Sequence, residues 1–321
     1  MNAAIKNISY HLPDRLEDNG LLQDENSDWR MADIEKKTGI KKRYVAAPGE
    51  TAVDLGVKAA EKIFEAGFAK EEIDAIILVT QSPDFVLPAS ACIVQHRLQL
   101  SKQCLAFDVN QGCSGFVVGL SLASSLITAG TAQHVLLICS ETYTKYIDRH
   151  DRTSRPVFSD GAAAVIVGPS AGSDIGPFDF GTDGSGADNL IVRNSGARTD
   201  DSGESRLFMN GSEVFMFTMD MVPKSVNRLL QKAGKTMDDV GMFIFHQASA
   251  LVLSNIQRRL QIGDEKIFNN LENIGNTVSA TIPIALKQAI DKGVIRPGEC
   301  VMLVGFGVGY SWGSCLINYN P

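Results

Sequence analysis

The sequence lacks the cysteine and histidine spacings that mark metal sites and disulfide frameworks. Its six cysteines form no Cys-x-x-Cys pair, and its five histidines show no paired spacing. Most of the cysteines lie in apolar runs, where a free cysteine usually acts as a small core residue. The sequence therefore predicts neither a disulfide framework nor a metal site, and nothing in it calls for a cofactor.

Long apolar runs and an excess of positive charge are also missing. No run approaches the roughly 20 apolar residues of a membrane-spanning helix, and the first 13 residues contain no apolar core of signal-peptide length. The formal net charge is −7, whereas binding to nucleic acid phosphates needs a basic surface. We therefore expect a cytoplasmic protein whose partners are neither membranes nor nucleic acids.

What the sequence does contain is an alternation of apolar, strand-like runs with segments of helical periodicity. The 321 residues, 44% of them hydrophobic and 21% charged, suffice for two domains or one large α/β unit. Apolar runs that are buried on both faces predict a largely buried sheet with helices packed on it. The expected strands are 75–80, 105–109, 135–139, 161–168, 242–245, 301–305 and 314–319, and the expected helices are 89–98, 116–126 with a cap at Gly130, 214–233, 249–261 and 279–292.

A polar, glycine-rich stretch at 170–203 separates two parts of this pattern. We expect it to be a connection with a surface excursion, which gives an N-terminal half at 1–170 and a C-terminal half at 171–321. In each half a helix is followed by an Asp-containing connector, a short strand and a polar turn. These segments span 72–81 in the first half and 237–247 in the second. Without a recognisable sequence repeat, this similarity is a weak indication of internal duplication.

Cys113 lies where a predicted strand meets a predicted helix. It sits in the run Asn110-Gln111-Gly112-Cys113-Ser114-Gly115, directly after the apolar stretch 104–109. Free N–H groups at a helix N-terminus stabilise a thiolate, which is the nucleophilic form of cysteine. A free cysteine is also often a small core residue, so this segment alone leaves both interpretations open.

Three further segments place polar groups at turns. His246 follows the apolar strand 242–245, and Asn276 lies in the loop Gly275-Asn276-Thr277 before a helix. In the run Gly305-Phe306-Gly307-Val308-Gly309, alternate glycines allow N–H groups to face a substrate oxygen. Each segment alone has an ordinary structural explanation, as a core histidine, a turn-forming asparagine and a strand bend.

Together these segments resemble one family. The order of Cys113, His246 in an HQA turn, Asn276 in a GNT loop and the motif GFGxGxxWGS from Gly305 is similar to that of the β-ketoacyl-acyl-carrier-protein synthase III enzymes of the thiolase-like superfamily. The resemblance spans essentially the whole chain. It implies a five-layered αβαβα α/β fold of two similar halves, with the nucleophile in 1–170 and the histidine and asparagine in 171–321. It also implies a homodimer and a catalytic triad of Cys113, His246 and Asn276.

The chemistry that the resemblance implies is a decarboxylative Claisen condensation. Cys113 would take an acyl primer from acyl-CoA and hold it as a thioester, with the N–H groups of Cys113 and Val308 as the oxyanion hole. A malonyl thioester, carried by an acyl-carrier protein, would then lose its carboxylate. His246 and Asn276 would donate hydrogen bonds to the enolate oxygen, and the product would be a 3-oxoacyl thioester for fatty acid synthesis or a specialised pathway.

The resemblance also suggests which residues contact coenzyme A. Lys37 takes the place of an arginine at the family's coenzyme A entrance, and Arg152 matches an arginine that flanks the adenine. Asp33 stands where the best-known members have a tryptophan that stacks on adenine, so Trp29, a little upstream, is the candidate substitute. Phe306, in the glycine-rich motif, is the remaining expected substrate contact.

Leu87 bears on the length of the primer. It aligns with a bulky aromatic residue that in some members reaches across the dimer and closes the acyl pocket. A leucine there would leave room for longer or branched primers, unless Gln81 or Tyr143 fills the space.

The expected carrier-protein surface is less basic than is usual in the family. Arg258 and Arg259 match two basic positions, whereas Met216 and Leu251 replace a lysine and an arginine. Fewer basic contacts predict a weaker or differently oriented dock for an acidic carrier. Two alternatives remain: acyl transfer from Cys113 to a hydroxyl or amine without condensation, and a non-catalytic subunit of a heterodimer. The presence of all three triad residues argues against the second.

Overall fold

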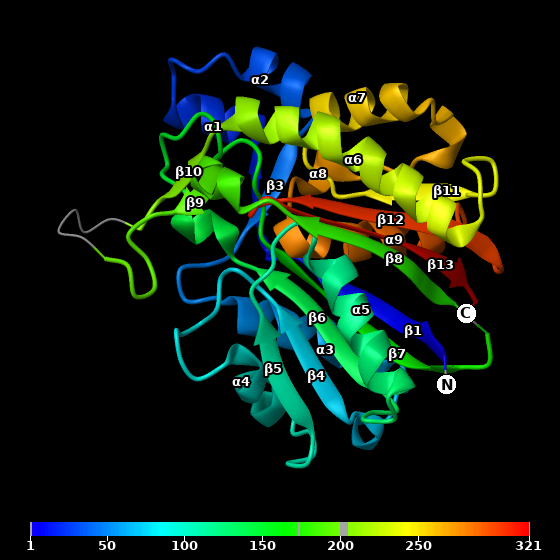
Figure 1. Cartoon of the computed structure of the whole chain (residues 1–321). Coiled ribbons are helices and arrows are strands. Elements are labelled where there is room, and N and C mark those ends of the chain that lie inside the picture. Colours follow the sequence, from blue (N-terminus) through cyan, green and yellow to red (C-terminus); the bar gives the residue numbers. More distant parts are fainter. Residues whose placement is uncertain (1, 173, 200–204, 321) are drawn as a thin grey trace.

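Two stacked β-sheets form the centre of the molecule (Figure 1). The computed structural model describes residues 2–172, 174–199 and 205–320. The first sheet has the order β1-β7-β6-β4-β5, formed by Asn2–His11, Gly161–Ser170, Val135–Glu141, Ala75–Val79 and Leu105–Val109. The second has the order β11-β12-β13-β8, formed by Met242–Phe245, Glu299–Gly307, Ser311–Tyr319 and Ile175–Thr182. In both sheets the strands that lead to polar turns run parallel, β6 with β4 and β5 in the first and β11 with β12 in the second.

Helices lie on both sides of each sheet. Helices α3 (Ala52–Glu65) and α4 (Ser90–Arg97) cover the outer face of the first sheet. Helices α5 (Gly115–Thr128) and α9 (Thr281–Asp291) fill the layer between the sheets, and α6 (Gly211–Ala233) and α7 (Ala250–Leu260) cover the outer face of the second. This order of layers confirms the αβαβα fold expected from the sequence.

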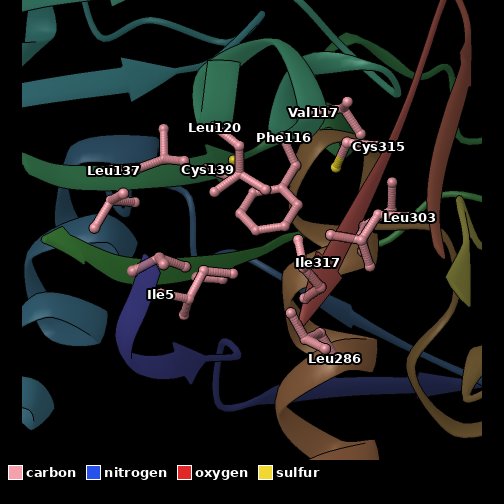
Figure 2. Close-up of a cluster of buried hydrophobic side chains, with 14 of the residues drawn as sticks. Ile5, Phe116, Val117, Leu120, Leu137, Cys139, Leu286, Leu303, Cys315 and Ile317 are labelled. Atoms are coloured by element: carbon pink, nitrogen blue, oxygen red, sulfur yellow. The ribbon is translucent and has the colours of Figure 1, made fainter. Parts of the chain in front are cut away.

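The apolar strands explain the layering because their side chains alternate between two hydrophobic cores. In β4, Ile77 faces the layer between the sheets and Ile76 faces α3. In β11, Ile244 faces the central layer and Phe243 faces α6 and α7. Figure 2 shows the central core, where Phe116 of α5 packs with side chains from both sheets.

Shorter elements gather beside the ends of the sheets. The strands β2 (Arg15–Asp18) and β3 (Lys42–Val45) pair antiparallel, as do β9 (Leu190–Val192) and β10 (Leu207–Met209). The short helices are α1 (Asn19–Glu25), α2 (Met31–Thr38) and α8 (Leu271–Ile274). Several of these elements line the cavity described below. Among the helices that the structure describes, none combines the length and apolar composition that a membrane span requires.

The expectation for the stretch 170–203 is wrong in one respect. It contains β8, an edge strand of the second sheet, and the short strand β9 in addition to irregular structure. Gly176 and Pro177 obscured β8, because proline cannot donate to a ladder and is tolerated mainly on edges. Residues 173 and 200–203 of the stretch lie outside the described part of the chain, and the proposed boundary between the halves remains a prediction.

Candidate active site

A cavity of about 970 Å³ lies beyond the carboxyl ends of three strands. Cys113 follows β5, His246 follows β11, and Phe306 and Gly307 end β12. All four line the cavity together with Asn276, which comes from the loop between α8 and α9. The structure thus brings the three residues of the predicted triad to one site, at the strand ends where α/β sheets usually bind ligands.

Glycines allow β12 to pass directly over the turn that carries Cys113. A Cβ atom at Gly305 would lie 2.6 Å from the Cys113 carbonyl oxygen, which is backbone and cannot rotate away. A Cβ atom at Gly307 would lie 2.9 Å from the Cys113 sulfur. The motif therefore packs backbone against backbone and leaves the thiol space that a side chain would take.

Cys113 is buried, and burial dominates its electrostatics. Loss of solvation, reinforced by the negative charge of Glu141, raises the pKa of the Cys113 thiol to about 12. The N–H groups of Val308 and of Cys113 itself hydrogen-bond to the sulfur and act in the opposite direction. The expected stabilisation of a thiolate at the start of α5 is therefore outweighed in the unliganded protein. At neutral pH Cys113 carries its proton.

Asn276 is held in a defined orientation. Its side-chain oxygen Oδ1 accepts a hydrogen bond of 2.9 Å from the backbone N–H of Val278. Its amide nitrogen Nδ2 lies 3.4 Å from Nε2 of His246. Because Oδ1 is occupied, Nδ2 is the atom of Asn276 that is available to donate to a substrate oxygen.

His246 is buried beside Asn276. Its Nδ1 atom lies 2.7 Å from the Thr281 hydroxyl, and its ring packs edge-on against Phe306 at 5.5 Å between centroids. Burial lowers the pKa of His246 to about 3, although a hydrogen bond to the Val278 backbone raises it slightly. The imidazole is therefore neutral near pH 7, and one of its two nitrogens has a free lone pair.

Glu141, at the end of β6, is a polar feature that the sequence analysis missed. The carboxylate is completely buried and accepts hydrogen bonds from the Ser279 hydroxyl at 2.7 Å and the Ser82 hydroxyl at 2.8 Å, and from the Gln81 N–H at 3.1 Å. Burial raises the pKa of Glu141 to about 7 despite these donors. In the sequence, the signal that could have identified Glu141 is its position at the end of an apolar strand. Glu141 joins the end of β4 to the loop that carries Asn276.

The expected substrate contacts separate into two groups. Lys37, Arg152 and Phe306 line the cavity. Trp29 does not: it is only 5% exposed and packs with Leu22, Met31 and Ile34 in a small core of its own. The expectation that Trp29 replaces the stacking aromatic is therefore wrong, because the apolar faces of α1 and α2 bury the ring.

Leu87 lies away from the cavity of its own chain. It is 79% exposed and follows two other exposed apolar residues, Phe85 and Val86. Within its own chain Leu87 does not line the cavity.

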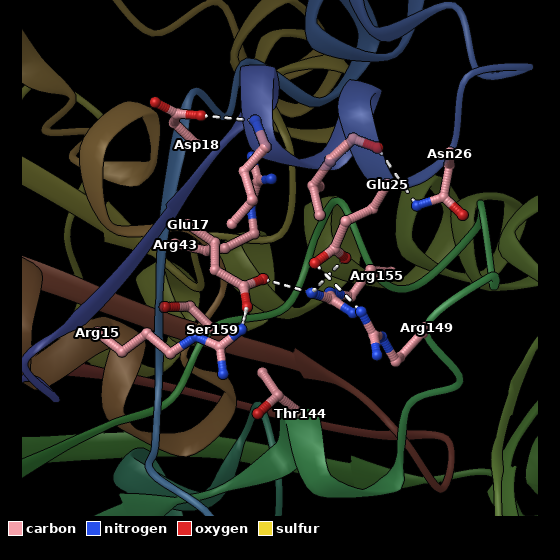
Figure 3. A network of polar contacts seen from close by, with 12 residues as sticks. Arg15, Glu17, Asp18, Glu25, Asn26, Arg43, Thr144, Arg149, Arg155 and Ser159 are labelled. Carbon is pink, nitrogen blue, oxygen red and sulfur yellow. Dashed lines mark hydrogen bonds and ion pairs between the residues drawn. The ribbon is translucent and has the colours of Figure 1, made fainter.

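The segment that carries Arg152 is anchored by a buried ionic network (Figure 3). Arg155 pairs with Glu17 of β2 at 2.6 Å and approaches Glu25 of α1 at 3.6 Å. Arg149 also pairs with Glu25, at 3.2 Å. The buried Arg155–Glu17 pair fixes this segment to β2, because breaking a buried pair leaves an uncompensated charge, and the contacts with Glu25 add a link to α1.

Helix α7 presents an apolar side chain at the cavity and basic side chains in its last turn. Arg258 and Arg259 are exposed near the end of α7. Met216 of α6 and Leu251 of α7 are also exposed, and both line the cavity. Within residues 2–172, 174–199 and 205–320, no group of three or more His, Cys, Asp or Glu side chains is placed to hold a metal ion.

Comparisons with known proteins identify the family. A family model described as 3-oxoacyl-(acyl-carrier-protein) synthase III matches residues 107–184, and the model of the C-terminal part of that family matches residues 230–319. The β-ketoacyl-acyl-carrier-protein synthase III of Natranaerobius thermophilus is 37% identical over 99% of this chain and 99% of its own.

Solved structures agree with these matches. A crystal structure of a 3-oxoacyl-(acyl-carrier-protein) synthase III has a TM-score of 0.96 and 43% identity, and covers 99% of this chain and 100% of the other. A priming β-ketosynthase from the R1128 polyketide biosynthetic pathway has a TM-score of 0.91 and 30% identity. It covers 99% of this chain and 96% of the other. The fold and the site define an acyltransferase of the thiolase-like class. The chain belongs to the β-ketoacyl-acyl-carrier-protein synthase III family.

Proposed function

We propose that this protein condenses an acyl primer from acyl-CoA with a malonyl thioester of an acyl-carrier protein, with loss of carbon dioxide. The observation that carries the proposal is the cavity in which Cys113, His246 and Asn276 meet, with two N–H groups directed at the Cys113 sulfur. This set provides a nucleophile, donors for a tetrahedral oxyanion and donors for an enolate.

The first half-reaction transfers the acyl group. The Cys113 sulfur attacks the thioester carbonyl, the oxyanion is held by the N–H groups of Cys113 and Val308, and the bond to the coenzyme A sulfur breaks. The thiol proton leaves with coenzyme A as its free thiol. Because the pKa of Cys113 is about 12, a base must take that proton during attack. The neutral His246, in the same cavity, is the candidate.

The second half-reaction makes the carbon–carbon bond. The malonyl thioester loses its carboxylate as carbon dioxide, and the resulting enolate attacks the acyl carbon on Cys113. Nδ2 of Asn276 donates to the enolate oxygen, because its Oδ1 is already occupied. Nε2 of His246 lies 3.4 Å from Nδ2 of Asn276, so the imidazole helps to hold that donor at the site. The 3-oxoacyl thioester leaves, and the Cys113 thiolate takes up a proton.

The cavity mouth supports the choice of substrates. Lys37 and Arg152 offer positive charge to the phosphates of coenzyme A, while Phe306 contributes to the wall near His246. Arg258 and Arg259 supply a basic patch for an acidic carrier protein, and Met216 and Leu251 add an apolar contact beside it. We place the reaction in the cytoplasm, in fatty acid synthesis.

A homodimer is part of the proposal. The adjacent side chains of Phe85, Val86 and Leu87 are all exposed, and contiguous exposed apolar groups usually mark a protein contact. Burial of this segment in a second copy would bring Leu87 close to the partner's site, as in the family.

Acyl transfer to a hydroxyl or amine without condensation is the second candidate, because the same buried nucleophile and oxyanion donors would suffice for it. The two reactions differ in carbon dioxide. The test supplies acetyl-CoA and malonyl-carrier protein and measures free coenzyme A, carbon dioxide and acetoacetyl-carrier protein. The condensation predicts all three in equal amounts. Release of coenzyme A without carbon dioxide, when an alcohol or amine is added, would contradict it.

A further inference from the structure

Cys113 belongs to a buried cluster that extends beyond the cavity. Phe158 and Leu190 of this cluster line the cavity, whereas Tyr143, Ile147 and Val278 lie outside its lining. The incoming pantetheine arm must reach Cys113 through the cavity. The acyl group that is left on the sulfur therefore needs space on the side that these residues occupy.

Tyr143 is the largest side chain at that position, and its ring is fixed from several directions. It packs against Phe158 at 5.2 Å between ring centroids and meets Tyr146 edge-on at 6.1 Å. Its hydroxyl lies 3.4 Å from Oε1 of Gln81. Burial raises the pKa of the Tyr143 hydroxyl, and the nearby Cys113 raises it further.

Gln81 connects the Tyr143 hydroxyl to the nucleophile turn. Its Nε2 atom donates to Oδ1 of Asn110 at 3.2 Å, and its backbone N–H donates to Glu141. A Cβ atom at Gly112 would lie 2.4 Å from Oε1 of Gln81. The Gln81 amide therefore rests on the residue directly before Cys113, and both ends of the side chain are tied.

We infer that Tyr143, held by Gln81, ends the acyl subsite and restricts the primer to a short acyl group of acetyl size. The inference rests on the proposed acyl transfer to Cys113. A longer chain would have to displace a buried ring that packs against two aromatic neighbours, and tightly packed interiors resist such insertions. Leu87 is exposed and lies outside the cavity, so it does not affect the space beside Tyr143 in its own chain.

The test is a competition between acetyl-CoA and hexanoyl-CoA, read by intact-protein mass spectrometry as the ratio of acyl groups on the protein. We expect the wild type to favour acetyl by about tenfold or more. Tyr143→Leu removes the ring and should shift the ratio about tenfold towards hexanoyl. Tyr143→Phe keeps the ring and should retain the preference for acetyl. This control shows whether a shift in Tyr143→Leu comes from loss of the ring or from any substitution at this buried position.

Tyr10→Leu is the matched control. Tyr10 is a partly buried tyrosine of β1 whose hydroxyl also contacts a glutamine, Gln288 at 3.2 Å, but it lies outside the cavity lining. It should leave the ratio unchanged. Equal loading of both groups by the wild type would overturn the inference. So would a ratio that responds to Leu87→Phe but not to Tyr143→Leu, which would place the limit on the partner subunit. Failure of every acyl-CoA to load would instead remove the proposed function, and the inference with it.

Discussion

Nδ1 of His246 lies 2.7 Å from the Thr281 hydroxyl, which in turn donates to the Val278 carbonyl at 2.9 Å. Because the hydroxyl hydrogen is used on Val278, the Thr281 oxygen accepts from Nδ1–H. The proton of the neutral imidazole therefore sits on Nδ1, and the free lone pair is on Nε2, towards Asn276. In this state His246 can accept the Cys113 proton, and it becomes a donor at Nε2 only after it has done so.

Removal of the Thr281 hydroxyl tests this arrangement. Thr281→Val keeps the shape but leaves Nδ1–H with a weaker partner, so we expect condensation to fall about tenfold, in line with the ~1–3 kcal/mol cost of a poorly satisfied buried donor. Thr281→Ser keeps the hydroxyl and should retain most activity. The measurement is kcat for condensation, with the pH profile recorded for each variant. Equal activity of the valine and serine variants would contradict a role for the hydroxyl.

A variant of Asn276 should affect the two half-reactions differently. Asn276→Ala removes the donor to the enolate oxygen but leaves the N–H groups of Cys113 and Val308 in place. We expect normal acetylation of Cys113 and a loss of condensation of about 100-fold or more. Acylation is measured by protein mass and condensation by carbon dioxide release. Condensation at the wild-type rate in this variant would favour simple acyl transfer.

Glu141 makes stability depend on pH in a defined direction. The pKa of Glu141 rises from an ordinary 4.5 to about 7 in the folded protein, so the folded state holds the proton more tightly. Its contribution to stability is complete below the unfolded pKa and is lost as the pH rises through the folded pKa. Between about pH 5 and about pH 8 the loss amounts to about 2 kcal/mol.

The matching experiment compares Glu141→Gln with the wild type in urea unfolding across that pH range. Asp160 and His246 titrate in both proteins, so the difference between the two curves isolates Glu141. The wild type should lose stability relative to the variant as the pH rises. A difference that stays constant with pH would show that Glu141 does not titrate there.

Arg258 and Arg259 test the carrier-protein surface. Replacement of both by alanine should raise KM for malonyl-carrier protein several-fold and reduce its dependence on salt, because exposed charges act mainly on encounter. Acetylation by acetyl-CoA should not change, since neither residue lines the cavity. An unchanged KM would place the carrier elsewhere, with the apolar pair Met216 and Leu251 as the next surface to examine.

The sequence predicted most of the fold because its buried strands are continuous apolar runs. The range expected for β11, 242–245, agrees with the structure, and so does 105–109 for β5. Of the strands in the two sheets, β1 and β8 were missed. β8 was missed because edge strands tolerate the glycine and proline that usually indicate a loop. The position of Cys113 between a strand and a helix was also visible in the sequence.

The electrostatics of the site could not be predicted in the same way. The high pKa of Cys113 and the low pKa of His246 both come from burial by residues that are distant in the chain. The same holds for Trp29, whose neighbours in the core are set by how α1 and α2 pack. Local sequence signals identify residue types and junctions, whereas solvation depends on tertiary packing.

The most direct test of the account is the acylation of Cys113. The protein is incubated with acetyl-CoA, its intact mass is measured, and the modified peptide is mapped, with Cys113→Ala and the exposed Cys92→Ala in parallel. We predict that the wild type and Cys92→Ala gain one acetyl group, located on Cys113, and that Cys113→Ala gains none. Acetylation of Cys113→Ala to the wild-type level, or an acetyl group mapped to another residue in the wild type, would contradict the account.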